Sequence, residues 1–360
     1  WIGYNMAYAS ISKPGLHFNT VAYTGTGSSN AVTGVGFQPD LVWIKNRATT
    51  GNHALFDAIN GVTKYVNSNT TYALQTSAPT LTAFGTDGFT VGSSADLNGN
   101  GNNIVSWNWK ANGAGSANTD GTAANVTVSA NTTAGFSIVQ FDATQSRVSV
   151  GHGLGSTPDA IFMKETEGAS GWVVGGFGLD WSGYLSLQST NAFNNDGNDS
   201  SGTGRMFTPD GYAPTASVWS TNGSAFLSGG TKTCIAYCFK SIKGFSKFGN
   251  YKGNGNADGP FIYTGFKPAF FLMKEATDAS TNWIMYDNKR STFNAVDDFL
   301  KPNSSDAEST GLDFDFLSNG IKCRNNNGGI NGSGNDYIYM AFAAEPLVAN
   351  VGASIPATAR

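Results

Sequence analysis

The stretch Pro39–Lys45, which reads PDLVWIK, returns twice further along the chain, as Pro158–Lys164 (PDAIFMK) and Pro268–Lys274 (PAFFLMK). Each copy begins with proline, continues with a run that is apolar or nearly so, and ends with lysine. Proline is tolerated where a strand begins, because its missing N–H breaks no ladder there, and a short apolar run is typical of a buried strand. The pattern therefore predicts one buried core strand that occurs in three copies.

The spacing of these copies predicts the domain organisation. They begin 119 and then 110 residues apart, which exceeds the roughly 20–50 residues of a solenoid repeat and matches the size of a small domain. Residues 111–131 are rich in Ala, Gly, Asn, Ser and Thr and have almost no large side chain, as in a linker. We predict an N-terminal arm at 1–17, a first repeat at 18–110, a linker at 111–131, a second repeat at 132–240, a third repeat at 244–344 and a C-terminal tail at 345–360.

Within each repeat, short apolar runs alternate with turn residues and show no sustained helical period. Phe18–Tyr23 alternates with period two, and Asp87-Gly88 stands between apolar flanks, which predicts a tight hairpin. The predicted fold class is all-β, with three tandem β-sandwich or jelly-roll-like domains of about 100 residues each. Short helical turns are expected at residues 57–65 and 295–300. A parallel solenoid is the structural alternative, but its short period is absent.

Composition and charge exclude some functional classes. Charged residues make up 13% of the chain, against a usual share of about a quarter, and the 46 glycines indicate many turns. A net charge of −4 without a basic block does not favour binding to nucleic acid. Because no apolar run approaches the roughly 20 residues of a membrane span, we expect a soluble chain without membrane insertion. Because the first residue is Trp1, we also expect a processed or truncated start.

Residues that carry catalytic chemistry are few and scattered. No spacing of the three histidines indicates a metal site, and His53 aligns with Gly171 and Asn282 of the other copies. Glu165 and Glu167 share one strand face, but a solvated strand end is favoured over a glycosidase pair. Asp57 and Asp287 recur at matched positions, which favours a role in the fold. We expect no catalytic residue, no cofactor and no disulfide, with the three cysteines buried as small apolar side chains.

Two kinds of Asn-rich loop are the remaining polar features. Asp96, Asn98 and Asn100 have the alternate oxygen side chains that open a calcium loop, but Trp107 stands at the twelfth position, where a bidentate Glu is required. These three residues are the candidate ligands if calcium binds, and a structural turn is favoured. Other Asn-rich loops carry amides beside aromatic residues, a combination that also binds sugars. The candidate binding residues in them are Asn194, Asn195, Asp196, Asn198, Asn325, Asn326, Asn327 and Asn331.

Three segments are specific enough to indicate a family. Gly34–Arg47, Gly244–Gly249 and Tyr337–Ala343 resemble a family of bacteriophage virion structural proteins, which are tail-fibre-like proteins of marine phages with a repeated β-rich domain of no assigned function. The resemblance covers nearly all of residues 18–360 and provides no catalytic residue. It implies that the chain is part of an extracellular virion, contacts other virion proteins, and follows a virion-anchoring part that would precede Trp1.

The function favoured by these patterns is a non-enzymatic tail fibre or spike component that contacts the host cell surface and recognises a glycan or protein receptor. Loops at the ends of sandwiches usually carry such binding. A homo-oligomer is expected, with a trimer as the usual fibre solution, although no heptad or collagen run indicates one. The alternative is a capsid-decorating or appendage-building subunit. A third possibility is a polysaccharide depolymerase, which needs two carboxylates about 5–10 Å apart in a groove.

Overall fold

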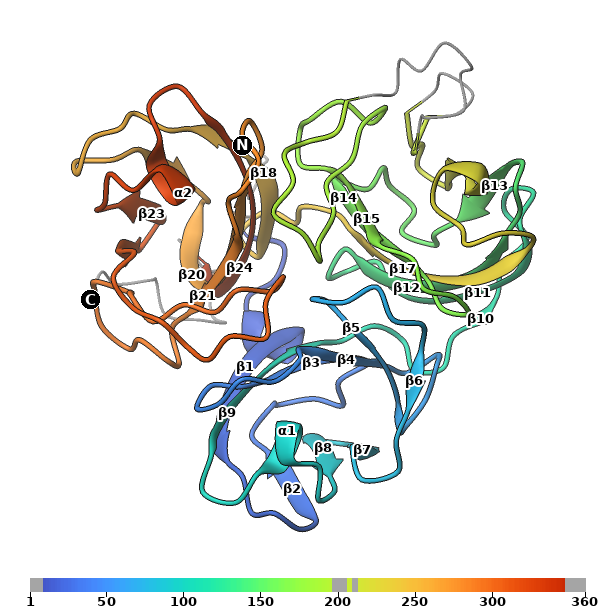
Figure 1. Cartoon of the computed structure of the whole chain (residues 1–360), viewed down its shortest axis with the longest axis horizontal. Helices are drawn as coiled ribbons and strands as arrows, with labels where there is room; N and C mark the ends of the chain where they lie inside the picture. Colours follow the sequence, from blue (N-terminus) through green and yellow to red (C-terminus); the bar gives the residue numbers. More distant parts are fainter. Residues whose placement is uncertain (1–8, 196–205, 209–212, 347–360) are drawn as a thin grey trace, which may run out of the picture.

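Antiparallel β-strands make up most of the chain. The computed structural model describes residues 9–195, 206–208 and 213–346, with 44% strand and 4% helix. The all-β class predicted from the sequence is therefore confirmed. Figure 1 shows the strands gathered into three lobes around a common centre, one for each sequence repeat. In the described part of the chain, no helix is long and apolar enough to span a membrane.

The first repeat contains one large and one small antiparallel sheet. The large sheet has the strand order β1-β9-β3-β4-β5-β6, and the small sheet has the order β2-β8-β7. The elements are β1 (Phe18–Thr24), β2 (Asn30–Thr33), β3 (Leu41–Asn46), β4 (Ala54–Asp57), β5 (Lys64–Asn67), β6 (Gln75–Thr76), β7 (Leu81–Gly85), β8 (Gly88–Val91), the short helix α1 (Ala95–Asn98) and β9 (Asn103–Trp109).

The third repeat follows the same path through two sheets. Its large sheet has the order β18-β24-β20-β21, and its small sheet has the order β19-β23-β22. The elements are β18 (Ser246–Lys252), β19 (Phe261–Tyr263), β20 (Phe266–Glu275), β21 (Trp283–Asp287), β22 (Phe314–Leu317), β23 (Gly320–Cys323), the short helix α2 (Gly328–Asn331) and β24 (Asp336–Pro346).

The second repeat keeps this path and adds two strands to its large sheet. That sheet has the order β10-β11-β12-β17-β14-β15, beside a two-stranded sheet of β13 and β16. The elements are β10 (Ser116–Ala117), β11 (Ala124–Asn131), β12 (Phe136–Ala143), β13 (Arg147–Gly151), β14 (Ala160–Glu165), β15 (Trp172–Gly176), β16 (Val218–Asn222), the 3-10 turn η2 (Gly223–Ala225) and β17 (Lys232–Phe239).

The predicted linker is wrong for much of its length, because residues 111–131 contribute β10 and β11 to the second repeat. β11 pairs with β12 along most of its length, and Val126 and Val128 are buried in the core of that repeat. The segment was predicted to be a linker because it contains almost no large side chain. Two valines at alternate positions nevertheless suffice for a strand when a neighbouring strand already offers its backbone hydrogen bonds.

Both faces of the repeated core strand are buried, which explains its nearly unbroken apolar run. All six residues of β3 are buried, as are all of β14 and β20. Because successive side chains of a strand point to opposite faces, Leu41 and Trp43 enter one core while Val42 and Ile44 enter another. The core that contains Val42 and Ile44 lies between the two sheets of the first repeat. The core that contains Leu41 and Trp43 is shared with the other two repeats.

We call this shared cluster the central core; it contains buried side chains from all three repeats. At its middle lie Trp109, Phe239 and Phe342, which occupy equivalent positions of β9, β17 and β24 because each pairs with the same position of its core strand. Their ring centroids are 6.5 Å apart for Trp109 and Phe239, 5.8 Å for Trp109 and Phe342, and 6.2 Å for Phe239 and Phe342. The three large sheets therefore face inward, and the small sheets lie at the outside of the lobes (Figure 1).

Other local predictions have mixed outcomes. The Asp87-Gly88 hairpin is confirmed as the turn between β7 and β8. Helical turns at 57–65 and 295–300 are wrong, since the first region is a turn leading into β5 and the second forms isolated β-bridges. The described part of the arm docks on its own chain, because Ile11 enters the central core and the Ser10 N–H donates to the Lys243 carbonyl at 3.0 Å.

Candidate functional site

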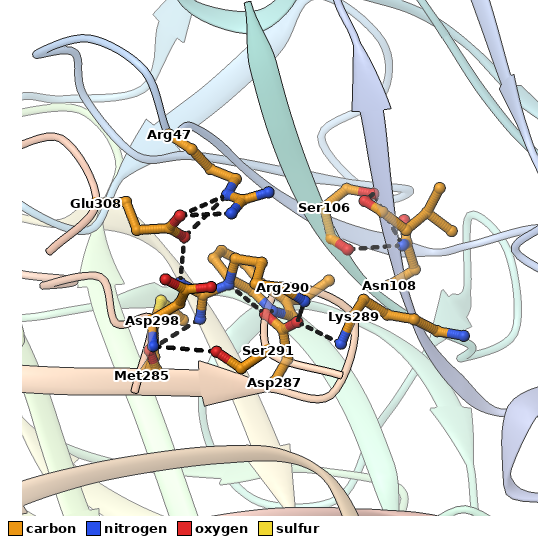
Figure 2. Close-up of polar contacts among 12 residues, drawn as sticks. Arg47, Ser106, Asn108, Met285, Asp287, Lys289, Arg290, Ser291, Asp298 and Glu308 are labelled. Atoms are coloured by element: carbon orange, nitrogen blue, oxygen red, sulfur yellow. Dashed lines mark hydrogen bonds and ion pairs between the residues drawn. The ribbon is translucent and has the colours of Figure 1, made fainter. Parts of the chain in front are cut away.

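The densest cluster of charged groups joins the third repeat to the first (Figure 2). Arg290 lies just after β21, and its side chain is fully buried. Its Nε donates to Asp287 Oδ2 at 2.6 Å, its Nη1 to Glu308 Oε2 at 2.9 Å, and its Nη2 to the Met285 carbonyl at 2.9 Å. Burial opposes the positive charge, but Asp287 and Glu308 outweigh it and raise the pKa of Arg290.

The first repeat supplies the other side of this cluster. Arg47 Nε donates to Glu308 Oε1 at 2.9 Å and Oε2 at 2.8 Å, and Trp107 Nε1 donates to Asp287 Oδ2 at 3.0 Å. The Arg290 guanidinium lies 5.6 Å from the centre of the Trp107 ring, within cation–π range. Both carboxylates are thus saturated by donors from two repeats. The arrangement suits a clasp between repeats, because neither carboxylate is left to bind a substrate or transfer a proton.

A different set of contacts joins the first repeat to the second. Tyr237 donates its hydroxyl to Asp57 Oδ2 at 3.1 Å, and Trp172 Nε1 donates to the Asn67 carbonyl at 2.8 Å. Burial raises the pKa of Asp57 despite the hydrogen bonds that it accepts. The matched positions of Asp57 and Asp287 are confirmed by the register of β4 and β21, since each ends the strand beside the core strand. Each of these aspartates bonds to an aromatic residue of another repeat.

The second and third repeats meet through the same structural position. Trp283 Nε1 donates to the Ser186 carbonyl at 3.0 Å, and the Phe193 N–H donates to the Ala276 carbonyl at 2.8 Å. The three junctions therefore run from first to second, second to third and third back to first repeat. Together they close the lobes into a ring around the central core.

His53 is displaced by one position from its sequence alignment. Extending the register of β4 by one residue places His53 beside Lys45, as Trp172 pairs with Lys164 and Trp283 with Lys274. His53 is therefore equivalent to Trp172 and Trp283, whereas the sequence comparison gave Gly171 and Asn282. Its imidazole is buried at the third-to-first junction, Trp43 Nε1 donates to its Nδ1 at 3.0 Å, and burial lowers its pKa well below the ordinary value. His53 therefore replaces a tryptophan in a structural position.

The remaining candidates for catalysis do not form a site. Glu165 is buried and accepts from Ser228, whereas Glu167 is exposed and lies 3.9 Å from Lys232. The three cysteines are buried and free, as predicted. Among residues 9–195, 206–208 and 213–346, no group of three or more His, Cys, Asp or Glu side chains is placed to hold a metal ion.

Asn98, one of the three candidate calcium ligands, is buried and bonded to its own chain. Its Oδ1 accepts from the Thr26 N–H at 2.9 Å and from Asn30 Nδ2 at 3.2 Å, which uses both lone pairs of the oxygen. Its Nδ2 donates to the Gly92 carbonyl at 2.7 Å. Asp96 and Asn100 are exposed. The geometry assigns Asn98 to the turn, since no side-chain lone pair remains for calcium.

Asn331 repeats this arrangement in the third repeat. Its Oδ1 accepts from the Asn254 N–H at 2.8 Å, and its Nδ2 donates to the Asn256 carbonyl at 2.7 Å and the Asn325 carbonyl at 2.9 Å. Gly25 and Gly253 are required beside these residues, because a Cβ there would lie 2.1 Å from the Gly99 and Gly332 carbonyl oxygens. Asn98 and Asn331 are therefore equivalent anchors that fix the loop before each last strand.

The other predicted loop residues have varied places. Asn194 is half-buried and donates to the Tyr184 hydroxyl at 3.2 Å, and Asn195 is exposed. Asn327 caps α2 by accepting from the Gly329 N–H at 2.8 Å, while Asn326 is exposed. Asn325 accepts from the Asn327 N–H at 2.9 Å. Asp196 and Asn198 lie outside the described residues.

One surface cleft was not predicted from the sequence. It has a volume of about 420 Å³ and lies between the segment that leaves the second repeat and strand β19, with Lys243, Lys247, Phe248, Tyr263 and Thr264 in its lining. Tyr263 is 53% exposed, so an aromatic ring is available to a ligand. Two of the lining residues, Lys247 and Tyr263, lie on strands that recur in the first repeat. Only a position-by-position comparison of the repeats shows that the first repeat has other residues there.

Comparison with known protein families finds a match over most of the chain. Residues 13–346 match the family described as Domain of unknown function (DUF7483). No curated protein and no solved structure matches the chain. The matched region extends from the described arm to the end of β24, so a single family domain spans all three repeats and the central core that they share. The chain therefore belongs to the DUF7483 family.

Proposed function

We propose that this chain is a non-enzymatic structural component of a bacteriophage particle, most specifically a tail fibre or spike component that contacts the host cell surface. The observation that carries the proposal is the central core. It holds three lobes in fixed positions, so that their small sheets and outer loops face away from the centre (Figure 1). Rigid scaffolds with outward loops are the usual carriers of recognition.

The use of charged groups supports a structural role over an enzymatic one. Asp287 and Glu308, the carboxylates of the densest cluster, are neutralised by Arg290 and Arg47. The lining of the surface cleft contains no Asp or Glu. A polysaccharide depolymerase of the usual type would need two carboxylates facing a groove, and this cleft does not supply them.

For the lobes themselves we propose jelly-roll-like sandwiches. In each repeat the chain alternates between the large and the small sheet, and an apolar core lies between the two sheets. The expected homotrimer and the contacts with other virion proteins stay predictions. In such an assembly, the threefold arrangement of lobes within one chain would supply three outer surfaces per subunit.

The experiment uses the purified full chain and the phage that encodes it. Antibodies against the chain, viewed by electron microscopy, are expected to label the tail fibres or spikes of intact particles. Host cells incubated with the chain are expected to adsorb fewer particles afterwards. Labelling inside the capsid or neck would contradict the proposal. Labelling over the head at the copy number of capsomers, without any effect on adsorption, would favour the capsid-decorating alternative.

A further inference from the structure

The surface cleft beside β19 contains a cation paired with an exposed aromatic ring. Lys247 Nζ donates to the Tyr263 carbonyl at 2.6 Å and lies 5.3 Å from the centre of the Tyr263 ring. In the described part of the chain this ammonium group has no carboxylate partner. Lys243 adds a second cation to the lining, which contains no acidic residue. The cleft therefore combines positive charge with aromatic surface.

The equivalent positions of the first repeat carry different residues. The strand registers make Asn19 equivalent to Lys247 and Thr33 equivalent to Tyr263. Asn19 Nδ2 donates to the Val35 carbonyl at 3.1 Å, so its short side chain is used by the adjoining backbone. The first repeat thus has neither the cation nor the aromatic ring.

A third position loses a negative charge between the first and the third repeat. Asp87 of the first repeat accepts from the Gly34 N–H at 3.1 Å and the Gly36 N–H at 2.6 Å. Its equivalent before the hairpin glycine of the third repeat is Asn319, whose backbone carbonyl accepts from the Thr264 N–H at 3.1 Å. From the first to the third repeat, one place therefore gains a lysine and a tyrosine and loses a carboxylate. Lys247 keeps a hydrogen bond to the same backbone segment that Asn19 contacts in the first repeat, and in addition it brings a positive charge that the first repeat lacks.

We propose that this cleft binds an acidic sugar unit of a host surface polysaccharide, with the sugar carboxylate at Lys247 and the sugar ring against Tyr263. This inference rests on the proposed function and names its ligand class. A carboxylate complements the ammonium charge. The C–H faces of a pyranose ring match the apolar body of tyrosine, while the phenol hydroxyl remains in water near the sugar hydroxyls.

The test measures binding of oligosaccharides to the full chain by calorimetry and saturation-transfer NMR. The acidic probes are oligogalacturonate, a glucuronate-containing oligosaccharide and oligosialate, and the neutral probe is maltotriose. At least one acidic probe is expected to bind about tenfold or more tightly than maltotriose, and its affinity is expected to fall as salt is added. Failure of every acidic probe to bind at millimolar concentration would overturn the proposal.

Two variants locate the site. Lys247→Met keeps the aliphatic stem and removes the charge, and Tyr263→Ala removes the ring; each is expected to weaken acidic-sugar binding about tenfold. Tyr72→Ala is the matched control, because Tyr72 is a 55% exposed tyrosine of the first repeat outside the cleft lining. Its affinity is expected to equal that of the unmodified chain. Equal binding by all three variants would place the sugar elsewhere and contradict the inference.

The adsorption experiment separates this inference from the proposed function. If the chain blocks phage adsorption but binds no acidic oligosaccharide, the ligand class is wrong and the proposed function stands. If it binds an acidic sugar at Lys247 but neither blocks adsorption nor occurs on the particle surface, the site stands and the proposed function is wrong.

Discussion

Trp107 of the first repeat donates its indole N–H to Asp287 of the third repeat at 3.0 Å, although the two residues are 180 positions apart in the sequence. Tyr237 and Asp57 form the equivalent hydrogen bond between the second and first repeats at 3.1 Å, also 180 positions apart. At the remaining junction the registers place Gly176 and Met340 in these two positions. Donor and acceptor are therefore both absent there, so that no buried carboxylate is left unpaired.

The ionic clasp at Asp287 gives the first prediction. Asp287→Ala leaves the fully buried Arg290 guanidinium with one fewer anionic partner, so the free energy of unfolding is expected to fall by about 3–5 kcal/mol. Urea unfolding followed by tryptophan fluorescence measures this loss. Asp306→Ala is the control, because its side chain is 51% exposed and its pair with Lys301 contributes less than about 1 kcal/mol. Equal losses in the two variants would argue against the clasp.

The lysine that ends each repeated stretch gives a prediction about pH. Lys45, Lys164 and Lys274 are buried, and burial lowers the pKa of each to about 8. The unfolded chain has an ordinary lysine pKa of about 10.4. Between these values the unfolded chain binds a proton that the folded chain does not, so stability from this group rises with pH, by up to about 1.4 kcal/mol per unit. Below about pH 8 both states are protonated and the contribution is constant.

Lys274→Met isolates one of these groups. Lys274 Nζ donates to the Glu275 carbonyl at 2.5 Å and to Thr281 Oγ1 at 2.8 Å, so the substitution also removes two hydrogen bonds. Their loss shifts stability at every pH and does not create a slope. The unfolding free energy of each protein is measured at about pH 7 and about pH 10. Between these two values, the stability of the unmodified chain relative to the variant is expected to increase. A difference that is independent of pH would show that Lys274 stays protonated in the folded state.

The repeated asparagine anchors give a third prediction. Asn98→Ala and Asn331→Ala each leave buried backbone groups without a partner, so each is expected to lower the free energy of unfolding by about 1–3 kcal/mol. Asn326→Ala is a suitable control, because this exposed residue of the same loop is expected to change stability by less than about 0.5 kcal/mol. Thermal unfolding compares the three. If the Asn331 and Asn326 variants are equally stable, Asn331 does not stabilise the fold and the prediction is wrong.

The sequence contained enough information for the core strand and for the Asp87-Gly88 hairpin. The run from Pro39 to Lys45 indicates burial because no polar residue interrupts Leu41 to Ile44. Period and length cannot tell which surfaces cover the two faces of a strand. Both a sandwich core and the central core satisfy the same apolar run, and only the three-dimensional arrangement shows that a second core joins the repeats.

The clasp and the cleft were harder to predict. Arg290, Glu308 and Arg47 are not repeated in the other copies. Arg47 meets the other two only because the first and third repeats lie side by side in the ring. The one available signal was the recurrence of Asp57 and Asp287, which correctly indicated a role in the fold. The linker prediction failed because a strand of small residues depends on its neighbour. The position of His53 was wrong by one residue because a histidine stands where the other two repeats have the tryptophan that marks this position.

The central claim is that the three repeats share one core and fold as one unit. Phe239 belongs to the second repeat but contacts Trp109 and Phe342 at the centre. Hydrogen exchange of Phe239→Ala, read by mass spectrometry on β9, β17 and β24, tests this claim most directly. The opening free energies of all three strands are expected to fall by the same amount, about 3–5 kcal/mol. A loss confined to β17, with β9 and β24 unchanged, would contradict it.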